Sequence, residues 1–394
     1  MDTSSDSESS TLSDDARIIQ LFTISRHATD RTRHQLDYFT GVVNDTNTRT
    51  LHHRNRELLQ RIGIKNLSPL LDDALIGDPT HPFHALVNAH EVDSGFRLCT
   101  RDLKQFYSRF RVSVSEFYSL YEELLNAIEQ PFSGNFSRPN RRVLTSAEML
   151  LVWLGYADNV GVSWLSIIFQ GVSRRSIDRA ADHVTLAINA FYSYQLDWPD
   201  AEERENLYGF YSCYDKVVGI MDGTHCPIQI PEYLEYEHYS GYKGTHTQNY
   251  LITCDPIGFI INVTGPFEGR GNDRAAINTT DFVDVNTSLL SPGELILVDG
   301  GFTGPGPIIH QFTKKELEAE TDESERKRML EWNEEFELNR AMIEHVIHNV
   351  KNRAQALADK YPRDKSKQPD LFFAACKICN RIRQLRLEFA LNIN

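Results

Sequence analysis

The spacing of hydrophobic residues between Phe96 and Phe191 predicts helices. Apolar side chains at intervals of three and four positions mark one face of a helix, and here they are Phe117, Leu120, Tyr121, Leu124 and Leu125. Thr145 and Glu148 then have the spacing of a capping box in front of a second apolar run. We therefore predict an all-α region over residues 96–195.

Two short helical segments within this region flank a glycine-containing turn at 171–173. They cover residues 163–169 and 174–183, and Ser173 would cap the second. This is the outline of a helix-turn-helix, whose second helix would present Arg174 and Arg175 to DNA. An ordinary helical hairpin with solvated arginines gives the same pattern, so the pattern alone leaves both interpretations open.

Beyond about residue 212 the pattern changes from helical to strand-like. Short apolar runs bounded by turn residues predict strands. The predicted strands are 216–221, 250–254, 259–263 and 295–298, of which the second and third form a hairpin. The predicted helices are 280–290 and 333–357, with a charged insertion at 313–337. Strands that alternate with helices indicate an α/β layer domain over residues 212–394.

The first 95 residues give weaker signals. Residues 1–15 are rich in Ser, Thr, Asp and Glu and contain no basic residue, which predicts a disordered acidic tail. Residues 16–95 mix helical patterning with Pro, Asp and His. We predict a poorly defined helical arm there.

Composition and charge narrow the class of protein. The 394 residues are 41% hydrophobic and carry a formal net charge of −14, which permits a buried core and excludes a polycationic nucleic-acid binder. No apolar run approaches the roughly 18 residues of a membrane helix, and the first residues do not resemble a signal peptide. Six irregularly spaced cysteines indicate a reducing compartment, cytosol or nucleus. Residues 351–386 nevertheless hold ten basic and three acidic side chains, so a basic face can coexist with the acidic total.

Acidic residues follow two of the predicted strands. Asp222 comes after residues 217–221 and Asp299 after 295–298, each with a glycine next in the chain. Strand ends beside glycine turns are where α/β sheets place their sites. With Glu344 from a predicted helix they would form an oxygen-only cage for Mg²⁺ or Mn²⁺, which suits two-metal phosphoryl transfer. Alternatively, each aspartate merely caps the loop after its strand.

Five motifs in order resemble those of PIF/Harbinger-type DDE transposases. They are residues 219–228, 239–249, 269–273, 297–302 and 333–344, within a similarity that covers about residues 215–390. The resemblance implies an RNase H-like catalytic domain preceded by a helix-turn-helix region. It implies Asp222, Asp299 and Glu344 as catalytic metal ligands and Asp273 as a fourth carboxylate ligand of the metal.

The resemblance also points to residues around the carboxylates. His225 would either orient a phosphate or water near the metals or be a buried structural histidine. The predicted nucleic-acid contacts are basic side chains from both regions: Arg141, Arg142, Arg174, Arg175, Lys243, Arg340, Lys351 and Arg353. Cys376 and Cys379 could be drawn as half of a zinc site, but the family has an apolar helix at this place, so core packing is favoured.

The function that the resemblance implies is cleavage of DNA at terminal inverted repeats and joining of the element to a target site, with Mg²⁺ or Mn²⁺ as cofactor. The sequence departs from the family at Phe336-Glu337, Ile347-His348 and Asn272. These departures keep open a domesticated DNA-binding or partner-binding protein with weak or no catalysis, and a nuclease without strand transfer. We expect DNA as partner, a nuclear location, and no membrane; a Myb-like accessory protein and a homo-oligomer are further possible partners.

Overall fold

A computed structural model describes residues 103–129, 144–169, 172–205, 207–209, 216–256, 258–278, 280, 289–302 and 306–392. The predicted acidic tail and helical arm at 1–95 lie outside these ranges, as does most of the helix predicted at 280–290. Within them, no helix is both long and apolar enough to cross a bilayer.

The helical region predicted from the sequence is present. Its helices are α7 (Leu103–Phe110), α8 (Val114–Ile128), α9 (Ser146–Ala157), α10 (Val162–Ile168) and α11 (Arg174–Phe191). The predicted capping box is confirmed, because the Thr145 hydroxyl accepts from the Glu148 amide while the Glu148 carboxylate accepts from the Thr145 amide. Trp153 is buried at the centre of this region and donates its indole N–H to the Thr185 hydroxyl at 2.9 Å.

A mixed sheet forms the second region. Its strands are β1 (Val217–Pro227), β2 (Tyr239–Ser240), β3 (Thr245–Cys254), β4 (Ile260–Glu268), β5 (Leu295–Leu297) and β6 (Ile308–Ile309). The order across the sheet is β4-β3-β1-β5-β6, with β2 pairing at the start of β3. The first three strands of this order are antiparallel, whereas β1, β5 and β6 are parallel. The predicted hairpin is β3–β4, so that prediction is confirmed.

One boundary prediction is wrong in a way that matters for the site. Asp222 does not end its strand, because β1 continues to Pro227. The reason is tertiary, because β3 pairs with β1 continuously from Ile220 to Pro227. This pairing keeps the polar second half of β1 in a strand, although its composition alone does not predict one. Asp222 therefore lies in the middle of a strand, where it pairs with Ile252 of β3.

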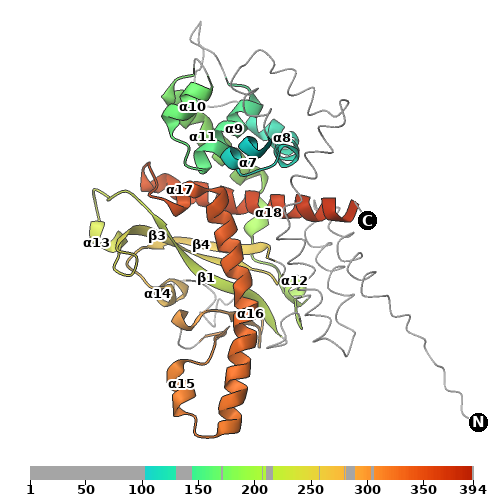
Figure 1. The fold of residues 1–394 in the computed structure, drawn as a ribbon, viewed down its shortest axis with the longest axis vertical. Helices are drawn as coiled ribbons and strands as arrows, with labels where there is room; N and C mark the ends of the chain where they lie inside the picture. Colours follow the sequence, from blue (N-terminus) through green and yellow to red (C-terminus); the bar gives the residue numbers. More distant parts are fainter. Residues whose placement is uncertain are drawn as a thin grey trace, which may run out of the picture.

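Helices cover the sheet and join it to the helical region. They are α12 (Ala201–Glu205), α13 (Glu235–His238), α14 (Asp273–Ile277), α15 (Lys314–Ala319), α16 (Glu323–Arg353), α17 (Gln355–Ala358) and α18 (Gln368–Asn392). Figure 1 shows α16 running across the sheet, with α17 and α18 between the sheet and the helical region. Phe336, Ile343 and Val346 bury one side of α16 against the core, while Tyr250 of β3 stacks on Phe372 of α18 at 3.9 Å.

The charged insertion predicted at 313–337 is a helical hairpin. It consists of α15 and the first part of α16, and it projects beyond the sheet at the end of the molecule opposite the helical region (Figure 1). Because α16 has 31 residues, it is about 46 Å long at 1.5 Å per residue. The same helix thus carries the exposed insertion and Glu344.

Candidate active site

Asp222 occupies the middle of β1 at the surface of the sheet. Its Oδ1 accepts a hydrogen bond from the Gly223 amide at 2.7 Å. Burial raises the pKa of this carboxyl to about 6; the Gly223 amide and Arg340 lower it, while Asp299 and Asp273 raise it. Two further carboxylates therefore lie close enough to repel the charge of Asp222.

Strand register explains how Asp299 reaches Asp222. In the parallel pair β1–β5, Ile220 lies opposite Leu297, so each aspartate comes two residues after a paired position. Asp299 then begins the short turn η3 (Gly300–Phe302), where its Oδ1 accepts from the Gly301 amide at 2.5 Å. The two aspartates therefore lie at the same level, just beyond the C-terminal end of the β1–β5 pairing.

Asp273 approaches Asp222 from the loop after β4. It is the first residue of α14, which Asn272 caps through the Ala275 amide. A Cβ at Gly223 would lie 2.0 Å from the Asp273 Oδ1, so glycine is required for this approach. Asn249 of β3 donates its Nδ2 to the same Oδ1 at 2.9 Å.

Glu344 lies on α16 beside an arginine. Its carboxylate pairs with the Arg340 guanidinium one turn earlier, and Arg340 also lies 3.8 Å from Asp222 Oδ2 and 3.6 Å from Glu337 Oε2. Burial lowers the pKa of Arg340, but the nearby carboxylates raise it by more, so the net shift is upward. These carboxylates are Glu344, Glu337, Asp222 and Asp299. Arg340 is therefore the cation around which these carboxylates gather.

The donor set fits a hard divalent cation. Asp222, Asp273, Asp299 and Glu344 offer only oxygen ligands, as Mg²⁺ and Mn²⁺ prefer. The Oδ1 of Asn249 is buried without a hydrogen-bond partner among the described residues, while its Nδ2 contacts Asp273. Within the described ranges, no three acidic, histidine or cysteine side chains already stand at metal-binding spacing. Glu344 would have to turn away from Arg340 to join the aspartates.

His225 lies on β1 beyond the carboxylates and is partly buried. Its Nδ1 is 2.9 Å from the Thr247 hydroxyl. Burial lowers the pKa of its imidazole; Asp273 raises this pKa, while Lys243 and Lys351 lower it further. The ring is therefore neutral near pH 7 and close to Asp273. Lys351 donates its amine to the His225 carbonyl at 2.8 Å, so α16 is pinned to β1 at this point.

The predicted nucleic-acid contacts fall into three groups. Arg141 and Arg142 lie outside the described residues. Arg174, Arg175 and Lys243 are exposed. The remaining three make internal contacts: Arg340 with the carboxylates, Lys351 with the His225 carbonyl, and Arg353 with the Arg111 carbonyl at 2.6 Å.

The helix-turn-helix interpretation rests on α10 and α11. These helices flank residues 170 and 171, which lie outside the described residues, and Ser173 caps α11 through the Ser176 amide. Trp164 and Ile167 of α10 are exposed. Because the turn between the two helices lies outside the described residues, the helix-turn-helix stays a prediction.

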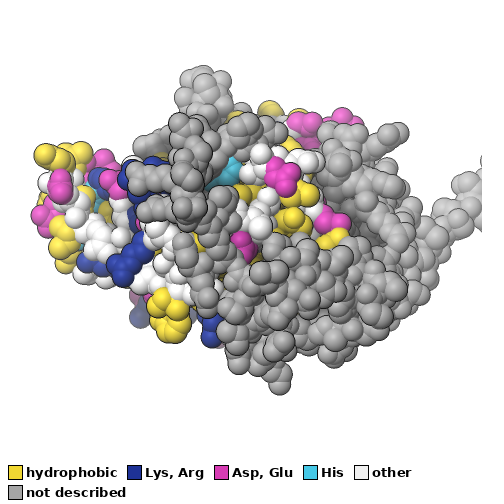
Figure 2. Space-filling model, turned by 90° about the horizontal axis from the view of Figure 1, so that it is seen from above, with side chains coloured by type: hydrophobic (Ala, Val, Ile, Leu, Met, Phe, Trp, Pro, Cys, Tyr) yellow, Lys and Arg dark blue, Asp and Glu magenta, His cyan; other side chains and the backbone are white. Residues whose placement is uncertain are grey.

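An aromatic lobe lies next to the loop that holds Asp273. We call residues 229–244 the α13 lobe; Tyr233 and Tyr242 are 80% and 88% exposed there. Lys243 lies over the Tyr242 ring at 4.5 Å, and Arg270 lies over the Tyr236 ring at 4.0 Å. Figure 2 shows hydrophobic and acidic side chains on the lobe at the left, with Lys and Arg side chains gathered beside it. Contiguous exposed apolar side chains usually mark a binding surface.

Sequence reasoning missed the residues that support the carboxylates. Asn249, Gly223 and Glu337 were not singled out as site residues. The motif signal around Asn249 was present, but its role depends on the β1–β3 register, which sets it beside His225. The pair Cys376 and Cys379 packs as the apolar alternative predicted, since Cys376 is fully buried in the core.

Comparisons with known proteins agree with the sequence resemblance. Residues 221–380 match the family model described as DDE superfamily endonuclease. The protein named "Putative nuclease HARBI1" is 22% identical in Mus musculus and 23% in Homo sapiens over 192 residues, which is 47% of this chain and 54% of either relative. The Bos taurus protein of the same name is 24% identical over 163 residues, 40% of this chain and 46% of its own. The chain thus aligns with about half the length of these curated relatives. No solved structure matches it. The predicted family resemblance is confirmed.

Proposed function

Given that residues 221–380 match the DDE superfamily endonucleases, we propose that this protein is a Mg²⁺- or Mn²⁺-dependent DNA endonuclease of the transposase type. The observation that carries the proposal is that Asp273 and Asp299 lie close enough to Asp222 to raise its pKa, and that Arg340 contacts both Asp222 and Glu344. The mixed sheet, with an antiparallel meander on one side of β1 and parallel strands on the other, supports an RNase H-like catalytic domain.

The residues present would bind and position the reacting groups. Asp222, Asp273, Asp299 and Glu344 would hold the divalent cations, which when bound supply Lewis-acid activation for attack at phosphorus. The Gly223 and Gly301 amides fix Asp222 and Asp299 before substrate arrives. His225 would hydrogen-bond a phosphate oxygen or water near Asp273, or it would have only a structural role through its contact with Thr247.

DNA would reach this edge from the basic and aromatic surfaces around it. Lys243 is exposed on the α13 lobe and can contact a phosphate, while the lobe's tyrosines offer faces on which unpaired bases stack. Arg174 and Arg175 at the start of α11 would contact DNA outside the site, as in a helix-turn-helix. With these contacts we propose cleavage at terminal inverted repeats, strand joining to target DNA, and a nuclear location. A homo-oligomer and a Myb-like accessory protein belong to the same proposal.

A second candidate is a domesticated protein that binds DNA or a partner without cutting. The contact between Arg340 and Glu344 favours it, because Glu344 is already paired. Glu337, where the sequence departs from the family, also favours this candidate, because it supplies a second carboxylate that holds Arg340 in place.

Cleavage of labelled DNA carrying the element's terminal repeats, with Mg²⁺ or Mn²⁺, separates the two candidates. We expect the wild-type protein to cut, and Asp222→Asn and Glu344→Gln to lose about two orders of magnitude or more in rate. Glu318→Gln, which neutralises an exposed carboxylate on α15, is the matched control and should cut like wild type. Wild-type protein that binds the repeats but is as inert as Asp222→Asn would establish the non-cutting candidate.

A further inference from the structure

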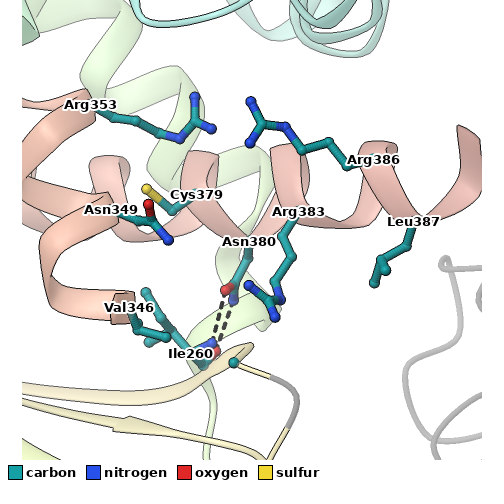
Figure 3. A pocket seen from close by; sticks show the side chains of 10 residues that line it. Ile260, Val346, Asn349, Arg353, Cys379, Asn380, Arg383, Arg386 and Leu387 are labelled. Atoms are coloured by element: carbon teal, nitrogen blue, oxygen red, sulfur yellow. Dashed lines mark hydrogen bonds between the residues drawn. The ribbon is translucent and has the colours of Figure 1, made fainter. Parts of the chain in front are cut away.

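A small cavity lies away from the carboxylates, between the end of α16 and the middle of α18. Its volume is about 40 Å³, roughly three times what one water needs. Arg353 from α16 and Arg386 from α18 lie at its upper side, with Asn349 and Cys379 below them (Figure 3). Asn380 closes the floor by bonding both the amide and the carbonyl of Ile260.

The two arginines bring more positive charge than their surroundings balance. Arg386 donates its Nε to Glu116 Oε1 at 2.7 Å. Arg353 donates to the Arg111 carbonyl, and within the described part of the chain it makes no ion pair. Burial raises the pKa of the Cys379 thiol to about 11 and both guanidiniums lower it, so both lie close to this sulfur. Among the described residues, Arg386 therefore has Glu116 as its carboxylate partner, whereas Arg353 has none.

One donor at the cavity is also unused. The Nη2 of Arg386 is buried, and among the described residues it has no hydrogen-bond partner. Leaving a buried charged donor without an acceptor is destabilising, and guanidinium groups bind tetrahedral oxyanions better than ammonium groups do because their donors are planar and fixed. A small anion between the two guanidiniums would balance their charge.

We propose that Arg353 and Arg386 bind a phosphate group in this cavity. The group is either free phosphate or a phosphate of bound DNA, since both present the same tetrahedral oxyanion. The site is separate from the carboxylates and does not depend on catalysis. Because Arg353 and Arg386 also hold Arg111 and Glu116, the anion would fasten the turn between α7 and α8 to the catalytic region.

Thermal unfolding and calorimetry with sodium phosphate, against sodium chloride at equal ionic strength, test the site. We expect phosphate to raise the unfolding midpoint saturably in wild type. Arg353→Gln, which leaves Glu116 paired, should weaken phosphate binding about tenfold or more. Arg386→Lys keeps a charge beside buried Glu116 but removes Nη2, so it should weaken binding while preserving the fold. Arg328→Gln removes a charge from the exposed part of α16 and should bind phosphate like wild type.

The second experiment measures binding of duplex DNA without terminal phosphates, in buffer without divalent cations. Weaker DNA binding by Arg353→Gln and Arg386→Lys, but not by Arg328→Gln, with no response to free phosphate, would assign the cavity to a DNA phosphate. Equal responses of all four proteins to phosphate and to DNA would overturn the proposal. Asp222→Asn should bind phosphate normally, so loss of cleavage and loss of this site are separable.

Discussion

At the scale of single residues, Asp222 has the most informative environment. It is a buried carboxylate whose neighbours include two more carboxylates and one arginine. Desolvation and like charges both favour its protonated form. The residue is therefore costly to the metal-free fold, as expected of a group kept for binding a cation rather than for stability.

Asp222→Asn should stabilise the metal-free protein at pH 8. The pKa of Asp222 is raised to about 6 in the folded protein, so its stability contribution is complete in acid and is lost as the pH rises through about 6. That loss is on the order of 3 kcal/mol for a shift of about two units. Denaturant unfolding of both proteins should show the variant more stable at pH 8, with a smaller difference at pH 5.

Added Mg²⁺ should reverse this order at pH 8, because only the wild type has the full carboxylate set. A variant less stable than wild type at pH 8 without metal would contradict the assignment of Asp222 as a penalised charge.

Arg340→Gln should make the fold depend on divalent cations. The guanidinium lies against Asp222, Glu337 and Glu344, so its removal leaves these carboxylates without their cation. We expect a loss of about 1–3 kcal/mol in unfolding free energy without metal, measured by urea titration, and a larger gain on adding Mn²⁺ than wild type shows. Arg328→Gln serves as the control, and equal losses in both variants would argue against a special role for Arg340.

At the scale of elements, local signals were predictable and tertiary ones were not. The cap at Thr145 and the hairpin around Asp255 depend on residues near in sequence, and both were predicted. The continuation of β1 past Asp222 depends on β3, and the contact of Asp273 with Gly223 depends on a loop that returns after β4. The carboxylates could thus be named from motifs. The contacts of Asn249 and Glu337 could not, because they depend on how β1 pairs with β3 and on which side of α16 faces the sheet.

Thr145→Ala should destabilise the helical region by about 1 kcal/mol. The change removes the hydroxyl that accepts from the Glu148 amide, while the reciprocal bond from the backbone amide of residue 145 to the Glu148 carboxylate remains. Hydrogen exchange of α9 amides should speed up accordingly. Ser146→Ala, at the next position, leaves the capping box intact and should have a much smaller effect on the same amides.

At the scale of the whole molecule, ion pairs join the helical and catalytic regions. Arg363 binds Asp182 of α11 through two bonds of 2.6 and 2.9 Å, and Lys367 binds the same carboxylate. Arg381 of α18 pairs with Glu123 of α8 in the same way. These partners are far apart in sequence, so neither charge counts nor periodicity could have predicted them. Part of the basic excess at 351–386 serves this junction rather than DNA.

Asp182→Asn should loosen the junction. It removes the charge shared by Arg363 and Lys367 in a partly buried setting, which we expect to cost about 1–2 kcal/mol. Limited proteolysis should then cut between the two regions faster. Glu318→Gln breaks an exposed pair with Lys314 on α15 and should change stability by less than about 0.5 kcal/mol. Identical proteolysis of both variants would show that the junction is held by apolar contacts instead.

The parallel pairing of β1 with β5 sets the order in which the site can form. The strands β1, β3 and β4 follow one another in the chain and can pair first, but Asp299 arrives only when β5 docks after the longer connection from β4. A nascent or partly folded chain therefore holds Asp222 without its partner. The carboxylate set is therefore complete only in the fully folded domain.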